Sequence, residues 1–421
     1  MRAIPYSLSS LKRCIRYKDL KTNPELIKSD YRTKLARESI QHTVSGADFL
    51  NNIKIIPIRN KPALQFKDIK VDLAVRLVDK NLKSAYGVKP SDRNSIISTL
   101  LSILHDGTPY HIYRFDIKNF YESIDREELF YSIKTEGKCS PQTIFLLDKI
   151  FSSFDYHGIE GLPRGLGISS TLSEIYLSHL DSTINRRNDC FFYSRFVDDI
   201  IIITSGDSTK KEIEEVIDNT LPSGIKLHKE GKRNFISLPK VKEEQKKKSK
   251  DEFDYLGYQF TIHSTYHNEQ TTYRKIRNVA VDISNEKVEK IKSRLASSFC
   301  SYLASKQAKD DYLLLKDRIR SLTGNYSIND PITGIKIKTG IYFNYKHANI
   351  ASRESLKKLD SFFLKLLFSK KNKLSCRIAK VISLKERKKL AGYTFTSGFQ
   401  NIRFHSFNYK KLNTIKRAWK K

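Results

Sequence analysis

Two adjacent aspartates interrupt a run of strand-forming residues between positions 194 and 204, which reads SRFVDDIIIIT. A buried carboxylate without a partner is costly, and neighbouring strand residues point to opposite faces of a sheet. We therefore expect a tight hairpin with Val197, Asp198 and Asp199 at its tip, where a divalent cation would offset the carboxylate charge. A turn with two ordinary aspartates is the alternative.

A second acid stands at the end of another short apolar and aromatic run. Asp116 follows residues 110–115, and a helix-like segment comes after it. A strand-end aspartate and a hairpin-tip aspartate can meet across neighbouring strands. Such a pair can hold two divalent cations for nucleotidyl transfer, one activating a 3′-hydroxyl and the other holding a triphosphate.

The net charge points to a polyanionic partner. The 421 residues include 77 Lys and Arg against 46 Asp and Glu, a formal charge of +31. Nucleic acid is the simplest partner for such a chain. We expect no membrane association, because no run of 18 apolar residues and no signal peptide occurs. The five cysteines lack CxxC spacing, which favours a reducing, cytoplasmic protein without structural zinc or disulfides.

Four motifs in order resemble those of reverse transcriptases. Residues 115–121 (FDIKNFY) resemble motif A, residues 161–170 (GLPRGLGISS) motif B, residues 196–199 (FVDD) motif C, and residues 253–258 (FDYLGY) motif E. The chain resembles bacterial reverse transcriptases, especially the unknown-group and defence-associated (antiphage) enzymes, and more distantly retron and group II intron enzymes. Together the motifs are specific, although each alone is weak.

The resemblance implies an α+β, right-hand polymerase with fingers, an antiparallel-sheet palm and a helical thumb. We expect a helical extension over residues 1–50, fingers over 51–112 and a palm over 113–265. Residues 241–252 are predicted to form an exposed charged loop. Residues 266–421 are then the helical thumb and a basic C-terminal RNA-binding region.

The resemblance also implies a metal site. Asp116, the carbonyl of Ile117, Asp198 and Asp199 would bind two Mg²⁺ ions, with Mn²⁺ as a possible substitute. In motif D, Lys232 is expected to protonate the departing pyrophosphate, with Lys229 as the alternative. Ordinary solvated lysines are the competing interpretation.

Further residues are expected to bind nucleotide and primer. Tyr121 would lie beneath the sugar and exclude a ribose 2′-hydroxyl, or it is an ordinary core aromatic. Motif B carries Arg164 where the family usually has glutamine, so nucleotide or template contact there would use charge and a planar fork. The other predicted residues are the fingers cations Arg76, Lys80 and Arg93, for which plain surface charges are the alternative. The predicted primer-grip residues are Tyr255, Leu256 and Gly257.

The C-terminal sequence predicts RNA binding. Residues 361–421 hold 17 Lys and Arg and one acid, Glu386. Aromatic residues, including Trp419, are interleaved as stacking surfaces for unpaired bases. We expect a structured non-coding RNA as template or scaffold, dNTPs, a DNA product in an RNA–DNA duplex, and either a partner protein or a homo-oligomer.

Three hypotheses remain open on sequence alone. The first is RNA-directed DNA synthesis in antiphage defence. The second is a template-independent or protein-primed DNA polymerase of the abortive-infection type. The third is a catalytically silent RNA-binding scaffold, against which the retention of all three acids argues.

Overall fold

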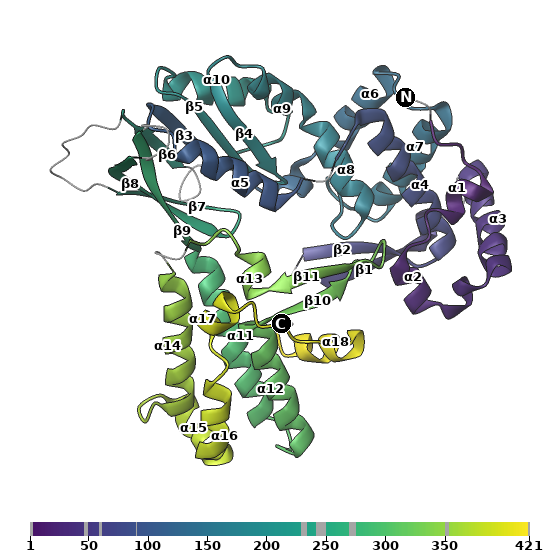
Figure 1. Ribbon diagram of the computed structural model, residues 1–421. Coiled ribbons are helices and arrows are strands. Elements are labelled where there is room, and N and C mark those ends of the chain that lie inside the picture. The colour runs from purple at the N-terminus through teal and green to yellow at the C-terminus, as the bar shows by residue number, and fades with distance from the viewer. Residues whose placement is uncertain are drawn as a thin grey trace. The chain divides into compact units, whose positions relative to one another are not determined.

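The structure is a computed structural model that describes residues 3–45, 49–58, 61–89, 91–228, 234–240, 250–268, 275–349 and 353–419. It divides into two compact units. The first comprises Met1–Ile103 and Thr108–Lys240, and the second Leu104–Gly107 and Val241–Lys421. Figure 1 labels the elements of both units.

The first unit is built around a four-stranded antiparallel sheet in the order β4-β5-β3-β6. A separate hairpin joins β1 to β2. The strands are β1 (Ile53–Ile58), β2 (Lys61–Phe66), β3 (Tyr110–Asp116), β4 (Cys190–Phe196), β5 (Asp199–Ser205) and β6 (Asn234–Leu238). The α-helices are α1 (Leu8–Lys12), α2 (Tyr17–Thr22), α3 (Ser29–Ser45), α4 (Ile69–Tyr86), α5 (Arg93–Leu104), α6 (Arg126–Thr135), α7 (Pro141–Tyr156), α8 (Gly167–Tyr176), α9 (Ser178–Asn185) and α10 (Lys210–Thr220).

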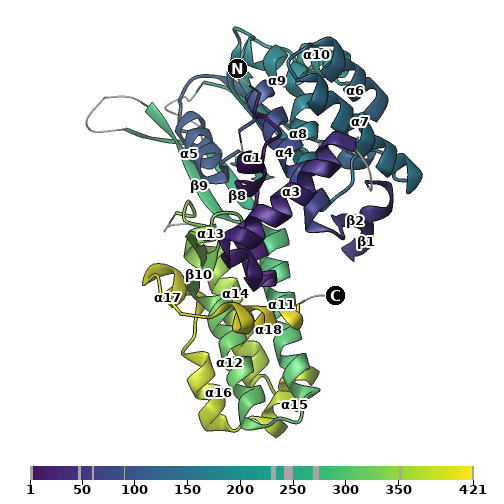
Figure 2. The same ribbon diagram turned by 90° about the vertical axis from the view of Figure 1, so that its right-hand side faces the viewer.

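The burial of β5 shows that the four-stranded sheet is covered on both faces. The four isoleucines at positions 200–203 are fully buried although alternate residues point to opposite faces, so β5 is covered on both sides. Helix α9 packs against β4, and α4 packs against both α7 and α8. Figure 2 labels the helices α4, α7 and α8. The N-terminal helices α1 and α3 pack on α4 through a smaller apolar cluster that includes Leu11, Leu35 and Leu77.

The second unit combines a three-stranded antiparallel sheet with a helical bundle. Its strands are β7 (Lys250–Tyr255), β8 (Tyr258–Asn268) and β9 (Lys275–Ile283), with a separate hairpin of β10 (Asn325–Asn329) and β11 (Lys336–Gly340). Its helices are α11 (Asn285–Leu303), α12 (Lys309–Thr323), α13 (Ile341–Asn344), α14 (Glu354–Phe368), α15 (Lys373–Val381), α16 (Leu384–Ala391), α17 (Phe395–Gln400) and α18 (Tyr409–Arg417).

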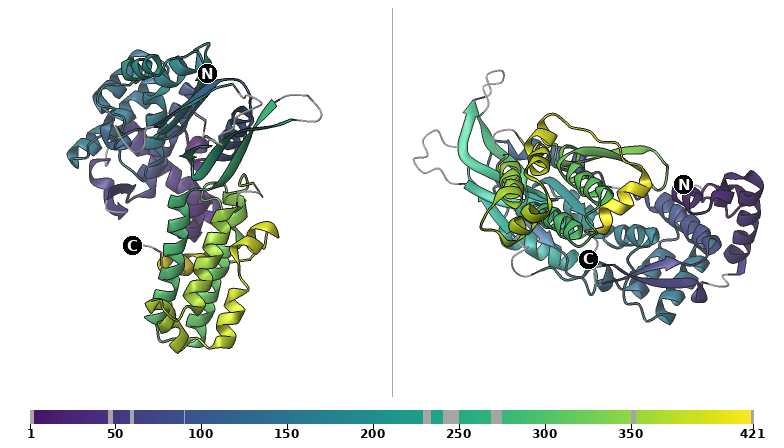
Figure 3. Two further views of the ribbon diagram at one scale, coloured as in Figure 1. Left: turned by 90° about the vertical axis from the view of Figure 1, so that its left-hand side faces the viewer. Right: turned by 90° about the horizontal axis from the view of Figure 1, so that it is seen from below.

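Helices α11, α12 and α14 form the centre of the bundle, drawn in green to yellow-green in Figure 3. Fully buried side chains at helical spacing, such as Leu295, Phe299, Leu359 and Phe363, join them into one apolar core. None of the helices in the described part of the chain combines the length and the hydropathy needed to cross a membrane.

The architecture confirms the predicted α+β class, with antiparallel sheets and a helical C-terminal region. Residues 250–265, predicted as palm, belong to the second compact unit. The boundaries of fingers, palm and thumb stay a prediction. Of the predicted charged loop at 241–252, residues 241–249 lie outside the described residues, whereas residues 250–252 are strand rather than loop because they pair with β8.

Gly398 provides a test of packing in the second unit. A Cβ atom at Gly398 would collide with the carbonyl oxygen of Thr323 at the end of α12. We expect Gly398→Ala to lower the free energy of unfolding by about 1–3 kcal/mol, measured by urea denaturation. Gly392→Ala is the matched control, because its Cβ would come no closer than 3.4 Å to another atom. Equal stability of the two variants would contradict this packing.

Candidate active site

The paired aspartates lie at the tip of a tight hairpin. Phe196 at the end of β4 pairs with Asp199 at the start of β5, which leaves Val197 and Asp198 as a two-residue turn. The predicted hairpin is thus confirmed, with Asp198 in the turn itself and Asp199 on the first rung of the ladder.

The turn contains an unusual backbone conformation. Val197 has a φ angle of 63°, in the left-handed region that β-branched residues rarely adopt. The first position of a type II′ hairpin turn requires a positive φ and ordinarily holds glycine. Strain of this kind persists only where the surrounding structure holds it, and it concentrates at functional sites.

Asp116 is brought to this tip by the pairing of β3 with β5. The register sets Asp116 opposite Asp199, and the N–H of Ile117 donates to the carbonyl of Asp198 at 3.0 Å. Asp116 is 8% exposed. The strand end and the hairpin tip therefore meet as predicted, although the metal-binding roles of the three carboxylates and of the Ile117 carbonyl stay predictions.

The three aspartates influence one another electrostatically. Burial raises the pKa of Asp199, the Arg114 guanidinium opposes this, and the charges of Asp116 and Asp198 raise the pKa further. Arg114 Nε lies 3.1 Å from Asp199 Oδ1. The sequence analysis missed Arg114. A cation inside a buried strand, two residues before an acid, is the signal that could have found it.

His228 is a second residue that the sequence analysis missed. Its Nε2 lies 3.4 Å from Asp116 Oδ2, and its backbone N–H donates to the carbonyl of Asp116 at 2.9 Å. His228 directly precedes Lys229, one of the two lysines predicted to act in motif D. Lys229 and Lys232 fall outside the described residues.

Among the described residues, no group of three or more His, Cys, Asp or Glu side chains is arranged as a metal site. One carboxylate oxygen of Asp199 accepts a hydrogen bond from Arg114. The donors nevertheless fit a divalent cation such as Mg²⁺, which prefers carboxylate oxygens. The repulsion that raises the pKa of Asp199 is also what a cation between the carboxylates would relieve.

Arg195 braces the hairpin by linking it to helices α8 and α9. Its side chain is 2% exposed and makes ion pairs with Glu174 on α8 at 2.7 Å and with Asp181 on α9 at 2.6 Å. It also donates to the carbonyl of Val197 at 3.2 Å. The strained turn is therefore tied to two helices by one buried guanidinium, which the sequence analysis did not single out.

Motifs A and B also meet. Tyr121 lies in a short 3₁₀ helix (Phe120–Ser123), and its carbonyl accepts from the N–H of Leu162 at 2.7 Å. Gly161 has a φ of 58°, and a Cβ there would collide with the same carbonyl. Arg164 lies over the Tyr121 ring, with its guanidinium carbon 5.4 Å from the ring centroid. Their roles in nucleotide binding stay predictions.

Among the predicted fingers cations, Arg76 requires correction. Arg76 is buried, and its guanidinium pairs with Asp19 and Asp72, each at 2.5 Å. A buried guanidinium with two carboxylate partners is a structural ion pair, which argues against the predicted role in triphosphate binding. Arg93 begins α5 and is partly buried. Its nucleotide role stays a prediction.

The predicted primer grip is a hairpin in the second unit. Leu256 and Gly257 form the two-residue turn between β7 and β8, with φ angles of 46° and 82°. Positive φ at both positions is the signature of a type I′ turn. Tyr255 is fully buried, so its ring packs in the core instead of facing a primer. Contact of the turn with a primer stays a prediction.

The predicted stacking role of Trp419 is wrong for its present position. Its indole N–H donates to the hydroxyl of Ser298 at 2.9 Å, and its ring packs against the core of the helical bundle. Arg294 lies over the ring at 5.5 Å. In the same C-terminal region Phe404 and Tyr409 are exposed.

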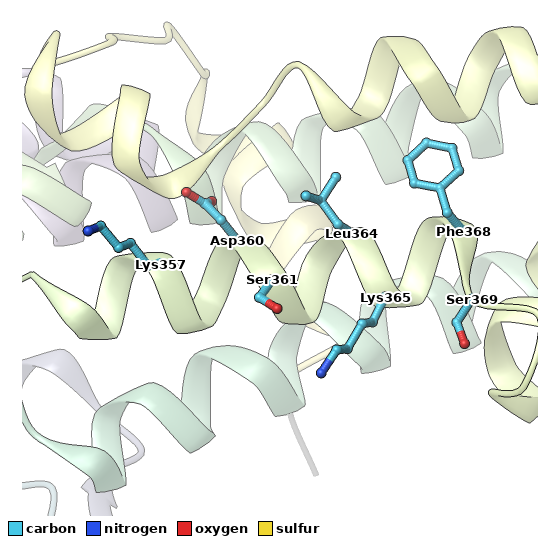
Figure 4. A pocket seen from close by; sticks show the side chains of 7 residues that line it. All are labelled: Lys357, Asp360, Ser361, Leu364, Lys365, Phe368 and Ser369. Atoms are coloured by element: carbon cyan, nitrogen blue, oxygen red, sulfur yellow. The ribbon is translucent and has the colours of Figure 1, made fainter.

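A surface hollow of about 620 Å³ follows one face of α14. Figure 4 shows its lining of Lys357, Asp360, Ser361, Leu364, Lys365, Phe368 and Ser369. Asp360 accepts hydrogen bonds from the backbone of Phe395 and Thr396, so it caps α17. None of the predicted site residues lines this hollow.

Arg195 offers a test of the brace. We expect Arg195→Ala to lower the free energy of unfolding by about 3–5 kcal/mol, because it leaves two carboxylates without their buried partner. Chemical denaturation measures this change. Lys211→Ala is the control, since Lys211 and Glu215 form an exposed pair on α10 that contributes about 0–1 kcal/mol. A small change in both variants would contradict the brace.

The carboxylates offer a test of cation binding. We expect Mg²⁺ to raise the melting temperature of the wild type, and Asp198→Asn to remove most of the shift. The shift should be smaller at pH 5 than at pH 8, because the raised pKa of Asp199 lets protons compete with the cation at low pH. Differential scanning fluorimetry measures both. A shift that persists in Asp198→Asn would place the cation elsewhere.

One comparison with known proteins, the match to a family model, agrees with the motifs. Residues 64–260 match the family model described as reverse transcriptase (RNA-dependent DNA polymerase). No match was found among curated proteins. Among solved structures, the chain is similar to telomerase from Candida albicans in complex with a TWJ fragment of telomeric RNA, at 11% sequence identity and a TM-score of 0.33.

The structural match covers 87% of this chain and 61% of the telomerase chain, so this chain spans less than two thirds of that protein's length. Motifs A, B, C and E all fall within the region that the family model matches. The mixed helical and antiparallel architecture fits a right-hand polymerase. The chain therefore contains a reverse transcriptase domain, the domain of RNA-dependent DNA polymerases.

Proposed function

We propose that this protein is an RNA-directed DNA polymerase whose reaction takes place at Asp116, Asp198 and Asp199. The observation that carries the proposal is the meeting of a buried strand-end aspartate with a hairpin-tip aspartate, inside the matched domain. Two Mg²⁺ ions bound there would supply Lewis-acid activation of the 3′-hydroxyl and neutralise charge on the triphosphate. Mn²⁺ is the possible substitute.

Other residues of the chain would then position the reactants. Tyr121 lies beneath the sugar and excludes the 2′-hydroxyl, which favours dNTPs over NTPs. Arg164 and Arg93 contact the nucleotide or template, and Leu256 with Gly257 contacts the primer through backbone groups. Lys232, outside the described residues, is proposed as the proton donor to pyrophosphate.

A structured non-coding RNA is the proposed template or scaffold. Residues 241–421 carry 40 Lys and Arg against 16 Asp and Glu, a net charge of +24 out of +31, which supports a polyanionic partner for the C-terminal part. The DNA product would leave as an RNA–DNA duplex. We further propose a cytoplasmic role in antiphage defence, on the motif resemblance, with a partner protein or a second copy of the chain.

Polymerisation can be tested with the RNA that copurifies with the protein, Mg²⁺, and labelled dNTPs or NTPs. We expect dNTP incorporation that follows the RNA sequence. An Asp198→Ala, Asp199→Ala double variant should lose at least about a hundredfold in rate, because several kcal/mol of transition-state stabilisation disappear. Asp207→Asn, an exposed acid just beyond β5, is the matched control and should keep its activity.

Other outcomes favour the alternatives. Incorporation that ignores the RNA sequence would support template-independent or protein-primed synthesis. Tight RNA binding without incorporation of any nucleotide would support the silent scaffold and overturn the enzymatic proposal. The defence role is tested separately, by challenging cells that express the wild type or the double variant with phage. Equal phage growth in both would contradict it.

A further inference from the structure

Arg164 of motif B contacts both Tyr121, the last residue of motif A, and Glu122, the residue that follows it. Its Nε lies 3.1 Å from Glu122 Oε1 and its Nη2 lies 3.3 Å from Glu122 Oε2, so the guanidinium and the carboxylate meet edge to edge. The same guanidinium lies over the Tyr121 ring. A cation over an aromatic face is attracted by the ring quadrupole.

The backbone around this contact is fixed independently. The carbonyl of Arg164 accepts from the N–H of Leu64 in β2 at 2.7 Å, and a Cβ at Gly165 would come within 2.7 Å of the Leu64 carbonyl oxygen. The backbone N–H of Leu162 donates a hydrogen bond to the Tyr121 carbonyl. The base of the Arg164 side chain is therefore anchored. The guanidinium at the other end of the side chain can still change position, and its contacts with Glu122 and the Tyr121 ring decide where it lies.

Glutamine at position 164 would not make the same contact. An amide carries no charge and has one donor group, whereas a guanidinium presents two parallel N–H groups to a carboxylate. The Glu122 carboxylate fits the guanidinium that this chain has in place of the usual amide. The opposite charges of Arg164 and Glu122 thus compensate one another.

We propose that Glu122 is a positioning residue for nucleotide selection. It holds the Arg164 guanidinium on the face of Tyr121 and so restricts the ring to the orientation that excludes a 2′-hydroxyl. This inference rests on the proposed function, because Tyr121 must lie beneath the incoming sugar. The side chains of Arg164 and Glu122 are 40% and 35% exposed, so dissolved salt should weaken the pair.

The test compares Glu122→Gln and Arg164→Gln with the wild type in single-nucleotide incorporation of dATP and ATP. We expect the ratio of kcat/KM for dATP over ATP to fall about two- to fivefold in each variant, the worth of an exposed cation–π contact. The change should lie mainly in the KM for ATP. Glu215→Gln, an exposed ion-pair acid on α10, is the matched control and should keep the wild-type ratio.

Two further measurements separate positioning from a general structural effect. In a Tyr121→Ala background, Glu122→Gln should no longer change the ratio, because the ring it positions is gone. In the wild type, the ratio should fall as NaCl rises, whereas in Glu122→Gln it should stay flat. Competition of dATP and ATP against a fluorescent dATP analogue gives the same comparison by binding alone.

The outcomes distinguish this inference from the proposed function. A wild type that incorporates no nucleotide overturns the proposed function itself. If the wild type is active and Glu122→Gln keeps the wild-type preference for dATP, the positioning role is overturned. The positioning role is also overturned if Glu122→Gln lowers the preference equally in the wild-type and Tyr121→Ala backgrounds. Neither result contradicts the proposed function. If Arg164→Lys keeps the wild-type ratio of kcat/KM for dATP over ATP, a positive charge beside Glu122 is sufficient for the positioning role, and the planar guanidinium is not required.

Discussion

The in-register pairing of β3 with β5 is the interaction on which the candidate site depends. Seven consecutive rungs run from Tyr110 and Ser205 to Asp116 and Asp199. Because buried backbone hydrogen bonds at alternate pairs hold the two strands in this register, the spacing of the carboxylates is set by the ladder and not by the side chains themselves. Motif B is joined to the short helix of Tyr121, and to β2, by further backbone hydrogen bonds.

Buried charge around the ladder is balanced by arginines from the strands. Arg114 on β3 faces Asp199, and Arg195 on β4 faces Glu174 and Asp181. Replacing such pairs with apolar residues is often neutral for stability, so stability alone does not explain their presence. Their positions explain it better: one restrains a site carboxylate and the other restrains the turn that carries Asp198.

The sequence predicted the parts of the site that depend on local pattern. The hairpin at residues 194–204 followed from a β-branched run broken by two acids. Two misassigned residues, Arg76 and Trp419, each have a partner far away in the chain. Arg76 is neutralised by Asp19, 57 residues earlier, and Trp419 is held by Ser298, 121 residues earlier. No local window contains both members of such a pair.

The two-residue turn at Val197 and Asp198 has a consequence for how this chain tolerates change in length. Side chains alternate faces along β5, so one inserted residue at the turn would exchange the two sets of isoleucines and move Asp199 off its rung opposite Asp116. A substitution at Val197 alters the strain of the turn and the packing of one side chain against the core, and leaves the register unchanged. In descendants of this chain, we expect the identity of that residue to drift while the number of residues between Phe196 and Asp199 stays constant.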